Sequence, residues 1–397
     1  MTSCRICNSS NVESAFVFKN HPIVHHLRKE RSSNDSYISS FELYECLTCG
    51  FLFARDYFAL PTVLYDNYIT LSGLKAQVHA QRVVDTIGYF INTPAPRIFE
   101  IGCNDGSFVK LLIAAGYDHI HAVEPAKDAF NQARIITDNV LNQFFSVNFA
   151  IKHLAANSYD IVVTRQVLEH ISDLHDFLEG IKLILAPDGI LVIEIPDHSM
   201  NYYFSDYSFW EEHINYFTLS TIQQLLTSHG FNIFYYETTI FSGQALIIYC
   251  KLSATEKSLS FKDCDYIMRK SYIQAFPSFK AKFQIFLQDM KNKYESLYVY
   301  GAGCRSLCLL NFLDSNEIIT AYIDDSSDKA NSYTAGSSIP ILRFEDTNPN
   351  AFYLLGVNAE IEARLIAKRK MSVENYCSIL PPSNRLPTFW HQFFRNI

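Results

Sequence analysis

One short segment, residues 96–115, most constrains the fold of this chain. Residues 99–108 read FEIGCNDGSF, and a mainly apolar run follows from 109 to 115. Gly102 and Gly106 lack a Cβ, so the backbone can turn tightly there and approach a ligand closely. The helix expected after the turn begins with free N–H groups. The segment therefore predicts a strand, a ligand-binding turn and a helix, as in an α/β sheet.

An acidic residue ends the next expected strand. Glu124 stands 22 positions after Gly102, and an acid about 20 residues after such a turn suits the hydroxyls of a ribose. The turn lacks the third glycine of a dinucleotide fold, and Glu100 and Asp105 would repel a pyrophosphate. We therefore expect S-adenosylmethionine, with its ammonium, sulfonium and ribose; the alternative is an α/β turn with incidental glycines. The expected donor-binding residues are Glu100, Gly102, Asn104, Asp105, Gly106, Glu124, Pro125 and Gln166.

Composition excludes several broad classes of protein. A chain of 397 residues exceeds one ordinary core, so two or three domains are expected. Hydrophobic residues make up 48% and charged residues 19%, which is typical of a globular chain rather than a disordered one. The net charge of −8 argues against non-specific binding to nucleic acid. Because the sequence has neither an apolar run of about 18 residues nor an N-terminal signal core, we expect a cytoplasmic protein.

Four of the ten cysteines have the spacing of metal ligands. Cys4 and Cys7 form one CxxC pair, Cys46 and Cys49 form another, and 38 residues separate the two pairs. Four thiolates close a tetrahedral zinc site and leave no position for water, so the zinc is expected to be structural. The alternative is a redox CxxC pair, which is disfavoured because neither pair opens a helix after a strand.

Three histidines, His21, His25 and His26, lie between the two CxxC pairs. They could replace a cysteine ligand, but we interpret them as polar surface residues. The other six cysteines have no such spacing and are expected to be buried small apolar residues.

Strand and helix patterns alternate along the middle of the chain. Strands are expected at 97–101, 119–123, 159–164, 189–195, 231–240 and 244–251, and helices at 62–92, 106–115, 126–136, 174–185 and 218–229. Asp188-Gly189 is expected to form the turn before the fifth strand. The last two strands should pair as an antiparallel hairpin, because no long helix separates them. A mostly parallel sheet that ends in one antiparallel strand is the usual methyltransferase architecture.

A second strand–turn–helix pattern follows helices expected at 255–295. It comprises a strand at 297–300, the turn Gly301-Ala302-Gly303, a helix at 304–313 and a strand at 319–324. The turn could hold a nucleotide or be merely a tight turn, and both interpretations stay open. We therefore divide the chain into a zinc-binding module (1–60), a methyltransferase domain (61–252) and a C-terminal Rossmann-like domain (253–397).

Three acid–base groups are expected at the carboxyl ends of strands of the first sheet, where open α/β sheets bind ligands. They are Glu169-His170, Asp197-His198 and Glu211-Glu212-His213. Beside two carboxylates, His213 should hold its proton more tightly than an isolated imidazole. It would then serve as a base for a weakly acidic C–H next to a carbonyl. We favour a structural role for His198, leave both roles open for His170, and favour a catalytic role for His213.

The order of these features resembles the zinc-containing, S-adenosylmethionine-dependent sugar C-methyltransferases of deoxysugar biosynthesis. The resemblance covers nearly the whole chain. Besides the CxxC pairs, the matching segments are Leu64-Tyr65-Asp66-Asn67-Tyr68, 100–106, Glu124-Pro125, Leu168-Glu169-His170, 212–217, 300–303, Leu309-Leu310-Asn311 and Ile339-Pro340-Ile341. The resemblance implies a class I methyltransferase Rossmann-like sheet, an N-terminal zinc module and a second, C-terminal Rossmann-like domain. The outer domains would help to hold a nucleotide-linked 4-keto sugar.

The resemblance also implies roles for individual residues. His213 would remove the proton at C3 of the sugar, next to the C4 ketone, and Glu212 would orient His213 or raise its basicity. The resulting enolate would attack the sulfonium methyl, while His170 and a tyrosine, Tyr65 or Tyr68, flank the sugar. Both a base and a group that stabilises the enolate oxygen are needed, because the C–H is weakly acidic. The expected substrate-binding residues are Tyr216, Gly301, Gly303, Arg305 and Asn311.

Three positions depart from the family pattern. Trp210 replaces a tyrosine two residues before Glu212 and cannot ionise. Arg305 replaces a lysine after the C-terminal glycine turn, so phosphate would be bound in fork geometry. Thr70 replaces a further aromatic residue. These changes affect the sugar side of the expected site rather than the methyl donor side.

Two alternatives to a sugar C-methyltransferase stay open at this point. One is a methyltransferase that acts on oxygen or nitrogen of another glycan or small metabolite. The other is a non-catalytic scaffold that keeps the fold. The expected partner is a nucleotide-linked sugar, with neither nucleic acid nor membrane, and both a monomer and a dimer are compatible with the sequence.

Overall fold

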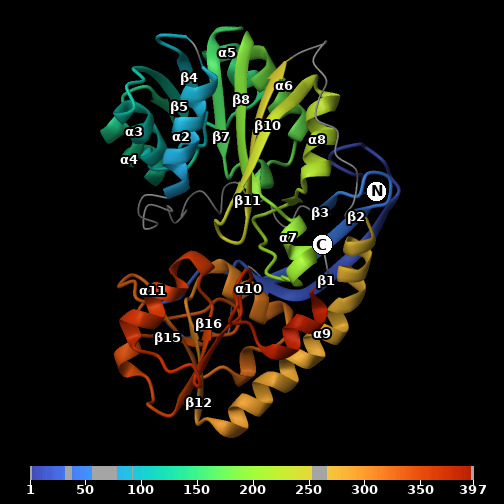
Figure 1. Cartoon of the computed structure of the whole chain (residues 1–397), viewed down its shortest axis with the longest axis vertical. Coiled ribbons are helices and arrows are strands. Elements are labelled where there is room, and N and C mark those ends of the chain that lie inside the picture. The colour runs from blue at the N-terminus through green and yellow to red at the C-terminus, as the bar shows by residue number, and fades with distance from the viewer. Residues whose placement is uncertain (1, 32–37, 56–77, 92, 253–265, 395–397) are drawn as a thin grey trace.

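The computed structural model describes residues 2–31, 38–55, 78–91, 93–252 and 266–394, and these residues form three β-sheets. The largest sheet lies at one end of the molecule and the C-terminal sheet at the other (Figure 1). The N-terminal strands run along one side, between the two. Each helix in the described ranges is too short or too polar to cross a membrane.

The central sheet has seven strands in the order β10-β11-β8-β7-β4-β5-β6. The strands are β4 (Arg97–Ile101), β5 (His119–Val123), β6 (Val140–Leu141), β7 (Tyr159–Arg165), β8 (Leu185–Pro196), β10 (Phe231–Thr239) and β11 (Ala245–Leu252). β4 to β8 are parallel, whereas β11 is antiparallel to both of its neighbours. The expected class I methyltransferase Rossmann-like sheet is confirmed.

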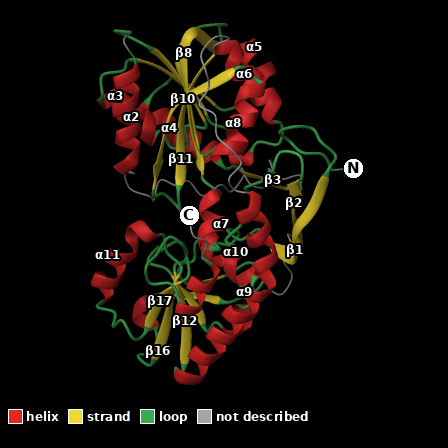
Figure 2. Ribbon diagram, turned by 45° about the vertical axis from the view of Figure 1, so that its right-hand side comes forward, coloured by secondary structure: helices red, strands yellow, loops and turns green. Residues whose placement is uncertain are grey.

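Helices cover both faces of the central sheet (Figure 2). They are α2 (Val78–Phe90), α3 (Ser107–Ala114), α4 (Lys127–Ile136), α5 (Val147–His153), α6 (Leu174–Ile184) and α8 (Leu219–Ser228). A further helix, α7 (Ser199–Phe204), lies beyond the sheet, towards the C-terminal unit (Figure 1). Because both faces are covered, a central strand has no solvent side, and residues 189–195 of β8 are apolar except at Gly189 and Glu194. This is why β8 reads as a continuous apolar run rather than an alternating pattern.

The central sheet differs from the expected one in three details. The expected hairpin of β10 and β11 is present, but β11 lies one position inside the edge, which β10 occupies. Asp188-Gly189 does not precede the fifth strand, because β8 already begins at Leu185 and its pairing with β7 shifts register there. The short elements β6, α5 and α7 were not expected, since two to seven residues carry too weak a pattern.

The N-terminal sheet has the order β1-β2-β3-β9. Three of its strands come from the first 54 residues, namely β1 (Val12–Pro22), β2 (Ile38–Cys46) and β3 (Leu52–Ala54). The fourth strand, β9 (Asn215–Tyr216), comes from the middle of the chain and pairs antiparallel with β3. The N-terminal unit therefore takes into its own sheet the two residues that lie just beyond Ile214.

The C-terminal sheet has six strands in the order β14-β15-β13-β12-β16-β17. They are β12 (Ser296–Tyr300), β13 (Ala321–Ile323), β14 (Ser332–Tyr333), β15 (Pro340–Leu342), β16 (Ala351–Leu355) and β17 (Tyr376–Ser378). All are parallel except β14. The accompanying helices are α9 (Tyr266–Lys293), α10 (Cys304–Phe312) and α11 (Ala359–Arg369). The second Rossmann-like sheet expected from the sequence is thus present.

One hydrophobic core joins the N-terminal and C-terminal sheets through the loop before β9. It contains Phe16 and Phe41 of the N-terminal sheet, Tyr207 and Phe209 of the loop before β9, and Tyr272 of α9. Tyr207 stacks on Tyr272 with ring centroids 4.4 Å apart, and the hydroxyl of each bonds a backbone carbonyl. Because this core packs around the loop at 206–214, it fixes the position of the histidine at 213.

Candidate active site

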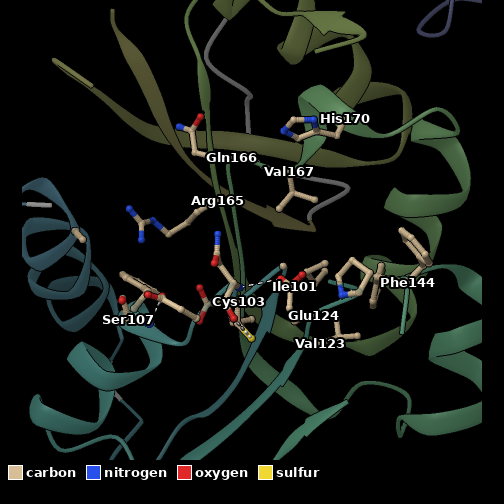
Figure 3. Close-up of a pocket in the computed structure, with 18 of the residues that line it drawn as sticks. Ile101, Cys103, Ser107, Val123, Glu124, Phe144, Arg165, Gln166, Val167 and His170 are labelled. Carbon is tan, nitrogen blue, oxygen red and sulfur yellow. Dashed lines mark hydrogen bonds between the residues drawn. The ribbon is translucent and has the colours of Figure 1, made fainter. Parts of the chain in front are cut away.

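A cavity of about 480 Å³ lies at the carboxyl ends of β4, β5 and β7. Figure 3 shows Cys103, Val123 and Glu124 on one side of this cavity and Arg165 to Val167 and His170 on the other. Seven of the eight residues expected to bind the donor line it, and Gly106 lies behind the lining, against α4. The volume falls in the range typical of small-ligand sites.

Both glycines of the first turn are required by the backbone. Gly102 has φ +73°, and a Cβ there would come within 2.5 Å of Cγ2 of Val167. Gly106 has φ +79°, and its Cβ would lie 3.1 Å from Cα of Ala133 on α4. L-residues avoid such φ values, so only glycine fits both the conformation and the space.

Glu124 ends β5 and holds the glycine turn in place. Its Oε2 accepts the N–H of Asn104 at 2.8 Å, and its Oε1 accepts the N–H of Ala126 at 2.8 Å. Burial raises the pKa of Glu124, although these two hydrogen bonds oppose the rise. The carboxylate oxygens keep lone pairs at the cavity wall, where two ribose hydroxyls could bind.

Glu100 is a buried carboxyl whose Oε2 has no hydrogen-bond partner among the described residues. Burial raises its pKa to about 8, although the positive charge of Arg165 opposes this. An unpartnered buried carboxyl at the wall of a cavity suits a cationic group such as the ammonium of S-adenosylmethionine. The residues present therefore fit the expected donor.

A buried charge network behind the cavity was not predicted. Nε of Arg165 lies 2.7 Å from Oε2 of Glu194, and Nε2 of His79 lies 3.1 Å from Oε1 of Glu194. Burial opposes ionisation of Glu194, but the charges of Arg165 and His79 lower its pKa to about 2. The side-chain amide of Gln166 donates to the same carboxylate. The position of Arg165, directly before the expected Gln166, is the only sequence signal that pointed to this network.

Two histidines, His170 and His213, pack against each other where His170 reaches the wall of the cavity. Their ring centroids are 4.9 Å apart, and Trp210 covers His213 at 4.7 Å. Nδ1–H of His170 donates to the backbone carbonyl of Glu212 at 2.9 Å, so Nε2 carries the free lone pair. His170 lines the cavity, and burial lowers its pKa to about 4.

The expectation that His213 holds its proton tightly is wrong. Burial, and to a smaller extent the neighbouring His170 and His198, lower the pKa of His213 well below its usual value. The carboxylate of Glu212 does not pair with His213 either: its Oε1 lies 2.7 Å from Nδ1 of His25. The residue order alone suggested a contact between Glu212 and His213, but the two side chains diverge along the loop.

Glu211 and Glu212 bind two of the histidines that we expected on the surface. Oε2 of Glu211 lies 3.0 Å from Nε2 of His21, and its Oε1 accepts the N–H of Val24. Glu212 pairs with His25 as described above. The interpretation of His21 and His25 as polar surface residues is therefore wrong, because β1 and the segment directly after it bring them into contact with this loop.

Glu169 belongs to one of the three acid–base groups expected from the sequence, but no role was predicted for it. It is 1% exposed, and neither of its oxygens has a hydrogen-bond partner among the described residues. Burial raises its pKa to about 8. Its carboxylate lies within 4.8 Å of ring nitrogens of both His170 and His213.

Of the three tyrosines expected at the site, Tyr216 is the one within the described residues. Tyr216 is buried in β9, and its hydroxyl donates to the carbonyl of Trp210 at 3.0 Å, which stabilises the loop around His213. Tyr65 and Tyr68 lie outside the described residues, as does Thr70.

Arg305, expected to bind substrate, has other partners. Its Nη2 lies 2.6 Å from Oδ2 of Asp206 and donates to the carbonyl of Pro381, and its Nη1 donates to Asn358. Nε donates to Ser208. Two of these bonds, to Asp206 and Ser208, join the loop before β9 to the C-terminal unit, and the other two hold Arg305 within that unit. A phosphate would have to replace some of them.

The C-terminal glycine turn is closely packed. Gly301 has φ +107°, and a Cβ there would lie 2.6 Å from the carbonyl oxygen of Gly356. The N–H of Ala302 donates to Oδ2 of Asp324, which also binds Nζ of Lys329. A Cβ on Gly303, by contrast, would meet nothing within 4 Å.

Asn311 lies away from the donor cavity. It lines a second, polar cavity of about 550 Å³ between β1 and the C-terminal unit, and its side chain bonds that of Asn316. The structure does not bring it together with His213.

The four cysteines with metal spacing converge on one point. All four Sγ atoms lie within 4.8 Å of one another, with 3.5 Å between Cys4 and Cys49 and 3.6 Å between Cys7 and Cys46. Zinc–sulfur bonds of about 2.3 Å in a tetrahedron separate the sulfurs by about 3.8 Å. The donor set and its spacing therefore fit a four-cysteine zinc site.

Comparisons with known proteins agree with this geometry. Residues 75–236 match a family model described as a methyltransferase domain, and residues 243–376 match one described as a C-methyltransferase C-terminal domain. The C-methyltransferase NovU of Streptomyces niveus is 24% identical over 264 residues, which are 64% of this chain. The match spans 61% of the length of that relative.

Solved structures are similar to about half of this chain. An S-adenosylmethionine-dependent methyltransferase from Aquifex aeolicus is 14% identical, with a TM-score of 0.37 over 49% of this chain and 98% of that one. A putative S-adenosylmethionine-dependent methyltransferase from Listeria monocytogenes is 12% identical, with a TM-score of 0.36 over 45% of this chain and 100% of that one.

Proposed function

We propose that this chain, which belongs to the S-adenosylmethionine-dependent C-methyltransferase family, methylates a carbon next to the ketone of a nucleotide-linked 4-keto-deoxysugar. The observation that carries the proposal is the contact between two neutral histidines: His213 packs against His170, and His170 lines a cavity whose acids suit the methyl donor. The similarity to the C-methyltransferase NovU supports carbon as the acceptor atom. The proposal includes the division of the chain into three domains, at residues 1–60, 61–252 and 253–397.

The donor side of the proposal rests on the first glycine turn. S-adenosylmethionine supplies a methyl group on a positively charged sulfonium. Glu124 would accept hydrogen bonds from its ribose, and the unpartnered oxygen of Glu100 would accept its ammonium. Gly102 and Gly106 allow the backbone to approach without a Cβ.

The acceptor side rests on the histidine pair. A neutral imidazole can accept a proton without first losing one, and the lowered pKa of His213 keeps it neutral at neutral pH, although it also makes His213 a weaker base than a free imidazole. His213 would take the proton from the carbon next to the ketone. His170 keeps a free Nε2 lone pair facing the cavity and would orient the sugar through a hydroxyl. Tyr65 and Tyr68 belong to the proposal as groups that flank the sugar.

The four-cysteine cluster is proposed to hold a structural zinc ion. Four thiolates complete the coordination, so the ion would offer no site for substrate. Its contribution would be to the fold of the N-terminal sheet, which contains β9 and thereby holds the loop of His213.

The first test is calorimetry with S-adenosylmethionine, followed by methyl transfer to a panel of thymidine- and guanosine-linked 4-keto-6-deoxysugars. A mass gain of one methyl group, located on carbon by NMR, is expected. A methyl group on oxygen or nitrogen would replace the proposed acceptor by the alternative one. Absence of donor binding would support a non-catalytic scaffold instead.

The role of His213 is tested by replacing it with alanine. We expect His213→Ala to lower turnover by at least about 10²-fold, the effect of losing a general base, and to leave donor affinity unchanged. Full activity of the folded variant would refute His213 as the base, whatever the acceptor.

A further inference from the structure

Two histidines from the end of β1 reach the loop that carries His213. His21 and His25 are four positions apart, and they meet the consecutive carboxylates of Glu211 and Glu212. The fourth strand of the N-terminal sheet, β9, begins two residues after His213. The N-terminal unit therefore supplies side chains, as well as a strand partner, to the proposed acceptor site.

The two histidine–glutamate pairs differ in how completely they are satisfied. Glu211 is fully buried and uses both oxygens, one on His21 and the other on the N–H of Val24. His25 offers only Nδ1 to Glu212, and its Nε2 is buried without a hydrogen-bond partner among the described residues. A buried N–H without an acceptor destabilises the folded protein. An acceptor atom of a ligand would remove that destabilisation.

The contacts of Glu212 bring His25 into the same cluster of residues as His170 and His213. The side chain of Glu212 binds His25, its backbone carbonyl accepts Nδ1–H of His170, and the next residue is His213. Three imidazoles thus meet around one residue. Their charges differ: burial lowers the pKa values of His170 and His213, so both are neutral.

His25 has the opposite tendency. Burial lowers its pKa, but the hydrogen bond and the charge of Glu212, together with the charge of Glu211, raise it overall. His26, whose ring centroid is 4.7 Å away, is the other titratable group that faces it. The site therefore holds a proton donor, His25, close to two neutral histidines that can accept a proton. Such a site can remove a proton from the substrate and stabilise the negative charge that forms on it.

We propose that His25 is a further catalytic residue, whose Nε2–H donates a hydrogen bond to the ketone oxygen of the acceptor. This inference rests on the proposed function. When His213 takes the proton, the C–H electron pair forms a C=C bond and the carbonyl π pair moves to the oxygen, beside His25. The C=C pair would then bond the sulfonium methyl, the pair of the broken S–CH3 bond would stay on sulfur as a thioether, and the oxygen pair would re-form the carbonyl. His25 keeps its proton throughout.

The test compares His25→Phe with His25→Gln in the full chain. Phenylalanine keeps a flat ring but has no donor, so kcat should fall by about 10²-fold, the usual effect of losing one oxyanion donor. Glutamine has an N–H donor and should restore part of the loss. Donor affinity, measured by calorimetry, should stay at the wild-type value in both variants. The matched control is His26→Phe, which should change kcat less than about twofold.

The outcomes separate this inference from the proposed function. If the wild type methylates no keto sugar, the proposed function fails, and the inference fails with it. If the wild type is active and folded His25→Phe is equally active, the inference alone is overturned. If His25→Phe does not fold, the inference is tested with Glu212→Gln instead. Glutamine keeps the shape of the Glu212 side chain but removes the negative charge that holds the proton on His25. Wild-type kcat in both Glu212→Gln and His25→Gln would then overturn the inference.

Discussion

At the scale of single residues, two carboxyl groups of the donor cavity, Glu124 and Glu100, differ in how many of their oxygens accept hydrogen bonds. Both oxygens of Glu124 accept backbone N–H groups, so its orientation is fixed before any ligand arrives. Glu100 has an unpartnered oxygen and a pKa raised to about 8 by burial, so it is mostly protonated at pH 7 in the free protein. A cationic ligand needs the carboxylate form, and binding must therefore release a proton.

This gives a pH prediction for the donor. Because the pKa of Glu100 lies above neutral pH in the free protein, donor affinity should fall as pH drops below about 8, by up to about tenfold per unit. Calorimetry at pH 7 in two buffers of different ionisation enthalpy should find about one proton released. Glu100→Gln should release none, whereas Asp105→Asn, at the same turn, should still release a proton on binding, because Glu100 is intact. Proton release by Glu100→Gln equal to that of the wild type would contradict the assignment.

Gly102 gives a second prediction at this scale, with a matched control. Gly102→Ala and Gly116→Ala both place an L-residue at positive φ, which costs about 1–2 kcal/mol in each case. Only at Gly102 does the added Cβ meet an atom, Cγ2 of Val167 at 2.5 Å, because Gly116 faces open space. Gly102→Ala should therefore lose donor binding, and Gly116→Ala should keep it, as calorimetry can measure. Equal donor affinity in the two variants would show that the close packing at Gly102 is irrelevant.

At the scale of elements, the sequence predicts local structure well and long-range pairing poorly. The strands and helices between 97 and 252 begin and end close to their expected positions, because periodic apolar patterns and glycine turns are local signals. β9 has only two residues, and its pairing with β3 crosses about 160 positions, so no pattern could reveal it. For the same reason, the partner of Glu212 was misassigned to its neighbour His213 rather than to His25.

The shared sheet leads to a prediction about zinc. Removing zinc with a chelator, or substituting Ser for the exposed Cys7, should unfold the N-terminal sheet and release β9 beside His213. Methyl transfer should then be lost, while donor affinity persists, because the donor cavity is built from β4, β5 and β7. Circular dichroism, calorimetry and transfer rates, followed through zinc restoration, check this. Chelator inhibition with the N-terminal sheet intact would indicate a catalytic metal instead.

At the scale of the whole molecule, the three sheets are assembled around the loop at 206–214. Tyr207 and Phe209 enter the common core, Glu211 binds β1, and Asp206 binds the C-terminal unit through Arg305. Each outer unit thus fixes one part of the loop that ends at His213. The sequence predicted the three units, but it contained no sign that the N-terminal and C-terminal units share one core, since each pattern was complete within its own segment.

Two roles of Arg305 can be distinguished by experiment. It either holds the loop before β9 on the C-terminal unit, as a structural clamp, or it binds the phosphate of the substrate. Its pairing with Asp206 is largely buried, so Arg305→Lys and Asp206→Asn should each destabilise the protein by roughly 1–3 kcal/mol, and the double variant should cost less than their sum. Urea unfolding of the four proteins measures this coupling. If Arg305 instead served mainly to bind phosphate, Asp206→Asn would free its guanidinium and tighten acceptor binding, whereas a clamp predicts weaker binding because the loop of His213 loosens. Additive destabilisation together with tighter acceptor binding would therefore return Arg305 to the substrate site.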